Sequence, residues 1–224
     1  LIMNKNIKIG ILGGGQLALM LTEAAFKLGI QDITVLDPTE NCPAQTIGAK
    51  QIIGSFNDKN KIIELASKVD VLTFDIESIN IDALFSASEI TKVYPSPNCL
   101  SVIQNKYLQN CFLKDLSIPI PKFYKIEDMP LSDNNEIIIK AKKGGYDGKG
   151  VWKIYKEDLP ELMERLNIYE DNIFAEELID IKKELAIIAY LSHDQRVICY
   201  PIVETIQKDG ICTEVICPVP LDVS

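Results

Sequence analysis

The residues best suited to do chemistry form a glycine-rich stretch between two apolar runs. Four glycines lie from Gly144 to Gly150, with Lys142, Lys143 and Lys149 beside them. The flanking runs, Ile137 to Ala141 and Val151 to Ile154, read as strands. Glycine lets backbone amides approach an anion closely, and ammonium groups supply the opposite charge. The pattern predicts a hairpin that closes over a polyphosphate. It is not a Walker A loop, because no Lys-Ser or Lys-Thr follows the glycines.

A second glycine turn, Gly13 to Ala18, follows the apolar run Ile7 to Leu12 and precedes residues with helical spacing that end at Gly29. It fits the G-x-G-x-x-[GA] pattern, and Asp37 closes the next apolar run. Exposed amides at the start of a helix bind any phosphate group. A nicotinamide or flavin site, another anion site and a simple tight turn all remain open from this motif.

The helices and strands predicted to position these motifs fall into two groups along the chain, and the first group alternates strands with helices. Further apolar runs at Ile33 to Leu36 and Val69 to Phe74, with the helical spacing of Ile62, Ile63 and Ala66 between them, predict a parallel sheet covered on both faces. We expect this α/β domain to occupy residues 1–97.

Residues 98–224 predict a second, strand-rich α+β domain. Asn105 can cap a helix that carries Leu108, Cys111, Phe112 and Leu116, and the prolines of Ile118 to Pro121 force an extended linker. A helix is expected at Asp158 to Leu166. Strands are expected at Ile173 to Leu178, Glu184 to Leu191 and Arg196 to Tyr200, with a hairpin turn at Ser192 to Gln195.

Composition excludes several classes of partner. The net charge of −9 and pI of 4.8 repel polyanions, so nucleic acid is not an expected partner. No apolar run reaches the roughly 18 residues needed to cross a bilayer, and the start lacks a secretory signal, which predicts a cytoplasmic protein away from membranes. The six cysteines are single and there is one histidine, so we expect free thiols and neither a zinc site nor a disulfide framework.

The stretch KAKKGGYDGKGVW, Lys140 to Trp152, resembles the phosphate-covering loop of the ATP-grasp carboxyaminoimidazole ribonucleotide synthases. Seven more segments resemble this family in the same order, so that the resemblance covers nearly the whole chain. They are ILGGGQL (Ile11 to Leu17), VLTFDIESIN (Val71 to Asn80), YPSP (Tyr94 to Pro97), IQNKYLQ (Ile103 to Gln109), AEELI (Ala175 to Ile179), KELAII (Lys183 to Ile188) and YPIVETIQKDGIC (Tyr200 to Cys212).

The resemblance implies a Rossmann-like pre-ATP-grasp domain, of the biotin carboxylase N-terminal type, followed by an incomplete ATP-grasp domain. It implies a ligase that forms a C–N bond in purine biosynthesis. ATP and bicarbonate would give carboxyphosphate, which carboxylates 5-aminoimidazole ribonucleotide. Mg²⁺ and a homodimer are also implied. The family's acidic magnesium ligands match no residue of this chain and are expected in sequence beyond Ser224.

The resemblance also implies roles for individual residues. Lys106 and Lys140 would reach the ATP phosphates, the main chain at Glu176, Glu177, Leu178 and Ile179 would hold adenine, Glu184 would hold the ribose, and Gln207 would lie nearby. The closing loop would contribute Gly145, Tyr146, Asp147, Gly148, Lys149, Gly150 and Val151, with Lys140, Tyr146 and Asp147 as catalytic residues. Gly15, Gln16, Glu77 and Tyr146 would bind the aminoribonucleotide, with the first turn on its phosphate.

Two departures from the family fall at the second substrate. The usual glutamate-isoleucine-glutamate-histidine run appears as Asp75 to Ser78, and a usual glycine-arginine pair appears as Ala18-Leu19. Three alternatives stay open. They are another ATP-grasp enzyme, such as formate-dependent glycinamide ribonucleotide transformylase or biotin carboxylase, an NAD-binding oxidoreductase, and a non-catalytic nucleotide-binding fragment.

Overall fold

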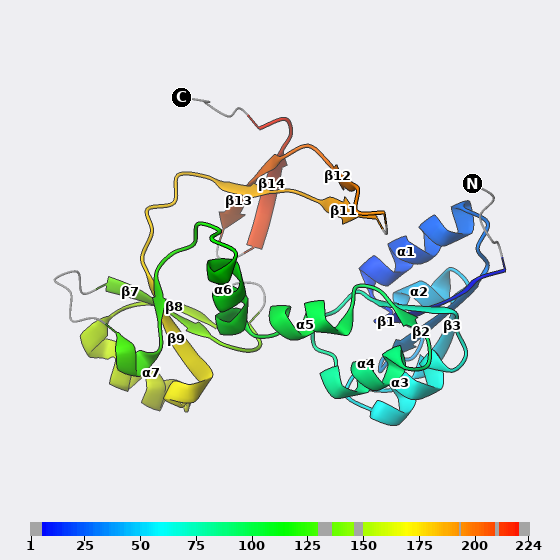
Figure 1. The fold of residues 1–224 in the computed structure, drawn as a ribbon, viewed down its shortest axis with the longest axis horizontal. Helices are drawn as coiled ribbons and strands as arrows, with labels where there is room; N and C mark the ends of the chain where they lie inside the picture. The colour runs from blue at the N-terminus through cyan, green and yellow to red at the C-terminus, as the bar shows by residue number, and fades with distance from the viewer. Residues whose placement is uncertain (1–5, 130–135, 146–149, 193, 209–210, 220–224) are drawn as a thin grey trace. The chain divides into compact units, whose positions relative to one another are not determined.

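The computed structural model describes residues 6–129, 136–145, 150–192, 194–208 and 211–219. The chain divides into two compact units, Leu1–Phe112 and Leu113–Ser224. Figure 1 shows the elements of each unit along the chain. The domain limits expected at residues 97 and 98 fall inside the first unit and stay a prediction. Within the described residues, no helix is both long and apolar enough to span a membrane.

The first unit is built on a five-stranded parallel sheet. Its strands are β1 (Lys8–Leu12), β2 (Asp32–Asp37), β3 (Lys50–Ile53), β4 (Val71–Phe74) and β5 (Lys92–Val93), in the order β3-β2-β1-β4-β5. All four neighbouring pairs are parallel. No neighbouring pair is therefore joined by a tight hairpin, and the carboxyl ends of β1, β2 and β4 lie at one edge of the sheet.

Helices cover both faces of this sheet, as the sequence predicts. Successive side chains of β1 project to opposite faces and belong to different buried clusters. Leu12 packs with residues of the third and fourth helices. Ile11 packs with residues of the first and second helices. The helices of the unit are α1 (Gln16–Lys27), α2 (Pro43–Thr46), α3 (Lys59–Ala66), α4 (Ile81–Ser88) and α5 (Pro97–Ile103), and α6 (Lys106–Asp115) begins in this unit and ends in the next.

The second unit begins with a four-stranded antiparallel sheet in the order β6-β9-β7-β8. One face packs against α7 through Ile137, Ile139 and Leu162. The elements are β6 (Phe123–Tyr124), η1 (Ile126–Asp128), β7 (Glu136–Ala141), β8 (Val151–Tyr155), η2 (Lys156–Asp158), α7 (Leu159–Leu166), η3 (Glu170–Asn172) and β9 (Ile173–Glu177). The predicted succession of α/β and then strand-rich α+β structure is confirmed.

The remaining strands are β10 (Glu184–Ala186), β11 (Ala189–Leu191), β12 (Val197–Cys199), β13 (Val203–Lys208) and β14 (Ile211–Ile216). They form a β10-β13-β14 sheet and a separate β11-β12 pair. The single strand predicted from Glu184 to Leu191 is wrong, because the chain leaves one sheet after β10 and enters the other at β11. No described residue from 181 to 219 is buried.

Candidate functional site

The glycine-rich hairpin joins β7 to β8. These strands pair antiparallel with Lys140 opposite Val151, and the amide of Ala141 donates to the carbonyl of Gly150 at 2.8 Å. Gly144, Gly145 and Gly150 have φ angles of 70°, 82° and 76°, which side chains with a Cβ rarely adopt. The glycines are thus required by the backbone at the base of the hairpin. Four predicted site residues, Tyr146, Asp147, Gly148 and Lys149, lie outside the described residues.

Strand alternation places Lys140 on the face of the sheet opposite α7. Ile137 and Ile139 pack toward α7, so Ile138 and Lys140 project to the other side. Val151 is directly opposite Lys140, and Glu176 is directly opposite Ile138, which puts both on that same side. We call this surface the Lys140 face, made of Ile138, Lys140, Val151, Phe174 and Glu176.

An ion pair joins Lys140 to Glu176 across β7 and β9. The Glu176 side chain is 7% exposed and the Lys140 side chain 29% exposed, so the carboxylate is buried while the ammonium keeps contact with solvent. Phe174, next along β9 on this face, is fully buried and meets the ring of Phe123 edge-on at a centroid distance of 6.5 Å. The rings of Phe174 and Phe123 limit the access of water to the Glu176 carboxylate. The lower local dielectric strengthens the electrostatic attraction between this carboxylate and a nearby cation.

The segment predicted to hold adenine is divided by the end of β9. Glu176 and Glu177 belong to the strand, and the amide of Glu177 already donates to the carbonyl of Lys122 at 2.9 Å. Leu178 and Ile179 follow the strand and lie outside its hydrogen-bonded ladder. The main chain of these last two residues is therefore the part of the segment best placed to offer a donor and an acceptor to a base.

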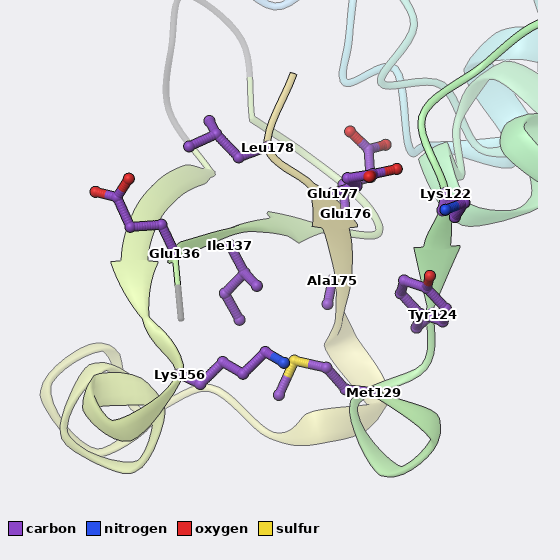
Figure 2. Close-up of a pocket in the computed structure, with 10 residues that line it drawn as sticks. All are labelled: Lys122, Tyr124, Met129, Glu136, Ile137, Lys156, Ala175, Glu176, Glu177 and Leu178. Carbon is purple, nitrogen blue, oxygen red and sulfur yellow. The ribbon is translucent and has the colours of Figure 1, made fainter. Parts of the chain in front are cut away.

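A cavity of about 360 Å³ opens where β7 begins and β9 ends, and it is lined by residues from both faces of the sheet, including Glu136 and Glu176 from the side of Lys140. Ile137 and Ala175 line it, and both side chains belong to the cluster that packs on α7. Figure 2 shows them between Lys156 and Met129 at one end and Glu176, Glu177 and Leu178 at the other. The cavity does not include Lys140, so we do not assign it to the phosphates. Its lining residues are Lys122, Tyr124, Met129, Glu136, Ile137, Lys156, Ala175, Glu176, Glu177 and Leu178.

Two further predicted nucleotide contacts, Glu184 and Gln207, belong to the β10-β13-β14 sheet. Glu184 is directly opposite Thr205, and Gln207 lies two residues further along β13. Side chains two apart in a strand project to the same side, which puts Glu184 and Gln207 on one face, next to a shift in the β13–β14 register between Ile206 and Gln207. Both are exposed. The register thus brings together two residues that are far apart in the sequence.

In the first glycine turn, two carboxylates from the chain itself take backbone amides. Asp75 Oδ2 accepts from the amide of Ala18 at 2.9 Å, at the start of α1. Asp37 Oδ2 accepts from the amide of Gly14 at 2.9 Å, and its Oδ1 accepts from Thr39 at 2.8 Å. A Cβ on Gly13 would lie 1.5 Å from Asp75 Oδ1. Close contact with the Asp75 carboxylate thus explains Gly13, whereas a Cβ on Gly14 would lie 2.4 Å from Cys42 Sγ and 2.9 Å from Asp37 Cβ.

The charge of Asp75 is poorly compensated. Its Oδ1 is buried and has no hydrogen-bond partner within the described part of the chain. Burial raises the pKa of the Asp75 carboxyl, the hydrogen bond from Ala18 opposes this shift, and the charge of Asp37 adds to it. A pyrophosphate at this turn would be repelled by the carboxylates of Asp75 and Asp37. The Asp37 carboxylate also accepts the hydrogen bond from the Gly14 amide. The geometry therefore argues against the NAD-binding alternative.

Glu77 and Lys106, predicted to contact different substrates, both belong to the first unit. Glu77 is exposed in the loop after β4. Lys106 is the first residue of α6, where the side chain of Asn105 accepts from the amides of Tyr107 at 3.1 Å and Leu108 at 3.2 Å. The predicted Asn105 cap is confirmed.

Sequence analysis missed Gln104, whose side chain donates a hydrogen bond to the loop that carries Glu77. No local signal marks it, because its partners lie 27 and 25 residues earlier.

The described residues hold no group of three histidine, cysteine, aspartate or glutamate side chains arranged to bind a metal ion. Mg²⁺ prefers several oxygen ligands in octahedral geometry. The described residues therefore do not fit a magnesium site made by protein side chains.

Comparison with known proteins agrees with the fold. Residues 6–104 match the ribonucleotide synthetase preATP-grasp domain, and residues 111–224 match the ATP-grasp domain. The chain is 36% identical to phosphoribosylaminoimidazole carboxylase of Schizosaccharomyces pombe, over 99% of this chain and 41% of that protein. It is 31% identical to N5-carboxyaminoimidazole ribonucleotide synthase of Synechocystis, over 96% of this chain and 55% of that protein.

A solved structure is similar over nearly the same span. It is N5-carboxyaminoimidazole synthase of Aspergillus clavatus in complex with ADP and 5-aminoimidazole ribonucleotide, with a TM-score of 0.84, 32% identity and coverage of 95% of this chain and 57% of that one. The chain thus spans roughly half the length of these proteins, and the resemblance predicted from its motifs is confirmed. By the match over residues 111–224, the chain belongs to the ATP-grasp family.

Proposed function

We propose that this chain supplies ATP and aminoribonucleotide contacts for an enzyme that carboxylates 5-aminoimidazole ribonucleotide with bicarbonate. Bicarbonate oxygen attacks the γ-phosphorus of ATP and ADP leaves. The carboxyphosphate then delivers its carbon to the exocyclic amine, so that a C–N bond forms while phosphate and a proton depart. The product is N5-carboxyaminoimidazole ribonucleotide, an intermediate of purine biosynthesis. The cytoplasmic location and the homodimer stay predictions.

The observation that carries the proposal is the position of Lys140 at the base of the glycine hairpin, beside the buried Glu176. A lysine held at a strand end can direct a point charge at a phosphate. The likeness to a structure with ADP and 5-aminoimidazole ribonucleotide bound supports both ligands. We propose that Lys106 and Lys140 stabilise phosphate charge, that Leu178 and Ile179 offer main-chain groups to adenine, and that Glu184 and Gln207 hold the ribose side.

The hairpin would exclude water while the amine attacks, because carboxyphosphate hydrolyses readily. Gly145, Gly150 and Val151 would form its described base, and Tyr146 and Asp147 its reactive part. ATP would arrive with Mg²⁺, which neutralises charge on the transferred phosphoryl group.

We propose that Gly15, Gln16 and Glu77 contact the aminoribonucleotide. The Ala18 amide is already taken by Asp75, and both Asp75 and Asp37 bring negative charge to the turn. Such a surface favours hydroxyl or amine donors of the ligand over its phosphate. Ribose hydroxyls are donors of this kind, so the turn need not hold the phosphate that sequence analysis assigned to it.

The test is phosphate release from ATP by the complete gene product, with and without 5-aminoimidazole ribonucleotide and bicarbonate. We expect turnover to require both, with the carboxylated ribonucleotide detected by mass spectrometry. Turnover that responds instead to formate with glycinamide ribonucleotide, or to biotin, would assign the chain to another ATP-grasp reaction. Binding of ATP without turnover under any of these conditions would favour a non-catalytic nucleotide-binding protein.

A further inference from the structure

The side chain of Gln104 joins the loop that carries Glu77 to the end of α5. Its amide nitrogen Nε2 donates to the carbonyl oxygens of Glu77 at 2.7 Å and of Ile79 at 2.8 Å. The amide of Ile79 donates to the same Glu77 carbonyl at 2.9 Å. Two donors therefore converge on one carbonyl, which fixes the main chain at the residue proposed to contact the aminoribonucleotide.

Both ends of this connection are anchored. The backbone amide of Gln104 donates to the carbonyl of Leu100 at 2.9 Å, so the residue completes the last turn of α5. Ile79 is 4% exposed and belongs to a buried cluster of the first unit. Glu77 itself is exposed. An exposed carboxylate on a fixed main chain is the arrangement that a pre-organised ligand contact requires.

The next residue along the chain, Asn105, fixes the main chain near Lys106, the proposed ATP contact. Asn105 caps α6 through the amides of Tyr107 and Leu108, and thereby sets the first turn that carries Lys106. Two consecutive amide side chains thus hold the proposed aminoribonucleotide contact and a proposed ATP contact within one unit. A displacement at Gln104 is passed to Glu77 directly, whereas Lys106 keeps its own cap.

We propose that Gln104 is a positioning residue for the aminoribonucleotide, acting by orienting Glu77. The proposal rests on the function proposed above. It goes further by naming a residue that touches neither substrate and yet sets the affinity for one of them. A side chain of the same length without the N–H donors releases both carbonyls, so Glu77 loses its fixed main chain while the fold keeps the volume of the residue.

Gln51 provides a matched control in the same unit. Its Nε2 also donates to two main-chain carbonyls, those of Thr39 at 2.7 Å and Asp37 at 3.3 Å. The loop that it holds follows β2 and carries no proposed substrate contact. Gln51 and Gln104 therefore share a residue type and the bonding of Nε2 to two carbonyls, although Gln51 Oε1 also accepts from the amide of Cys42 at 3.4 Å, and they differ in the loop that they position.

The test uses Gln104→Met and Gln104→Glu in the complete gene product, with Gln51→Met as the control. We expect KM for 5-aminoimidazole ribonucleotide to rise about tenfold in both Gln104 variants, with KM for ATP within about twofold of its original value, because about two hydrogen bonds are lost. Hydrogen exchange should be faster at the Ile79 amide in these variants. The Gln51 variant should keep both KM values.

The possible failures are distinguishable. If the unaltered protein turns over with 5-aminoimidazole ribonucleotide but the Gln104 variants keep its KM, the inference is overturned and the proposed function stands. Equal increases in both KM values, or the same change in the Gln51 variant, would show a general loss of structure and overturn it too. If the unaltered protein shows no dependence on 5-aminoimidazole ribonucleotide, the proposed function fails and the inference fails with it.

Discussion

Lys140 and Glu176 form an ion pair from adjacent strands, with the carboxylate almost fully buried and the ammonium partly open to solvent. A second lysine–glutamate pair, Lys153 to Glu136 at 3.1 Å, lies on the same side of the same sheet, with side chains 53% and 34% exposed. The two pairs share their chemistry and differ in burial. Exposed pairs contribute little to stability, whereas removing one partner of a buried pair is costly.

If Lys140 stabilises phosphate charge as proposed, replacing it with alanine should lower ATP turnover by the complete gene product about a hundredfold. It should also lower the free energy of unfolding by about 2 kcal/mol, because the buried Glu176 carboxylate loses this ammonium. Lys153→Ala should change neither quantity much. Urea denaturation and steady-state kinetics measure both effects.

A double variant separates the two roles of Lys140. Adding Glu176→Gln to Lys140→Ala removes the buried charge, so we expect most of the stability to return while turnover stays low. Recovery of turnover in the double variant would contradict a direct role of Lys140 at the phosphates.

Gly13→Ala should be strongly destabilising, by about 3 kcal/mol or more, because a Cβ there lies 1.5 Å from Asp75 Oδ1 at a φ of 109°. Gly144→Ala shares the positive φ but its Cβ would meet nothing within 4 Å, so the cost should be only about 1 kcal/mol. Thermal unfolding of the two variants tests the difference. The double variant with Gly13→Ala and Asp75→Ala should recover part of the lost free energy of unfolding. If it does not, contact with Asp75 is not the cause of the destabilisation.

The raised pKa of Asp75 makes its ionised carboxylate unfavourable in the folded state. The free energy of unfolding therefore decreases as the pH rises from the unfolded pKa near 3.8 through the raised folded pKa. Asp75→Asn should stabilise the protein at about pH 7, and this advantage should shrink as the pH falls toward about 4. The measurement is urea denaturation of both proteins across that range. Parallel profiles would contradict the assignment.

The carboxyl of Glu64 on α3, whose side chain is 37% exposed, should titrate unusually low. Hydrogen bonds from Lys68 and then Lys61 lower the pKa of its carboxyl to about 2. Its stabilising contribution is present above the unfolded value of 4.5 and is lost as the pH falls through about 2. Carboxyl NMR titration measures this. In Lys68→Ala the midpoint should rise toward the unfolded value, and high salt should reduce the shift.

Short-range patterns were enough to predict the strands that flank the glycine hairpin, the helix capped by Asn105 and the parallel sheet of the first unit. The sequence could not predict where Glu184 to Leu191 divides, because each half pairs with a different partner strand, β13 or β12. Strand pairing of this kind depends on distant residues. The apolar residues of that run are also exposed, so burial gave no local guide.

The same distinction separates the site residues that were found from those that were missed. Lys140 carries its own signal, a lysine at a strand end before four glycines. Glu176 was predicted for its main chain, yet its side chain is the partner of Lys140. The Gln104 contact became visible only when α5 and the loop after β4 were placed together. Sequence motifs predict which residues can bind a ligand or take part in chemistry, and the tertiary structure determines which of these side chains contact one another.

The first glycine turn is held from several distant points of the chain. Gly13 donates to the carbonyl of Leu36, Gly14 accepts from the amide of Ala44, and Asp75 bonds to Ala18. The turn can therefore reach its final shape only after β2, α2 and the end of β4 have assembled around β1. During folding it would be among the last parts of the first unit to become ordered, and protection of its amides would report that assembly is complete.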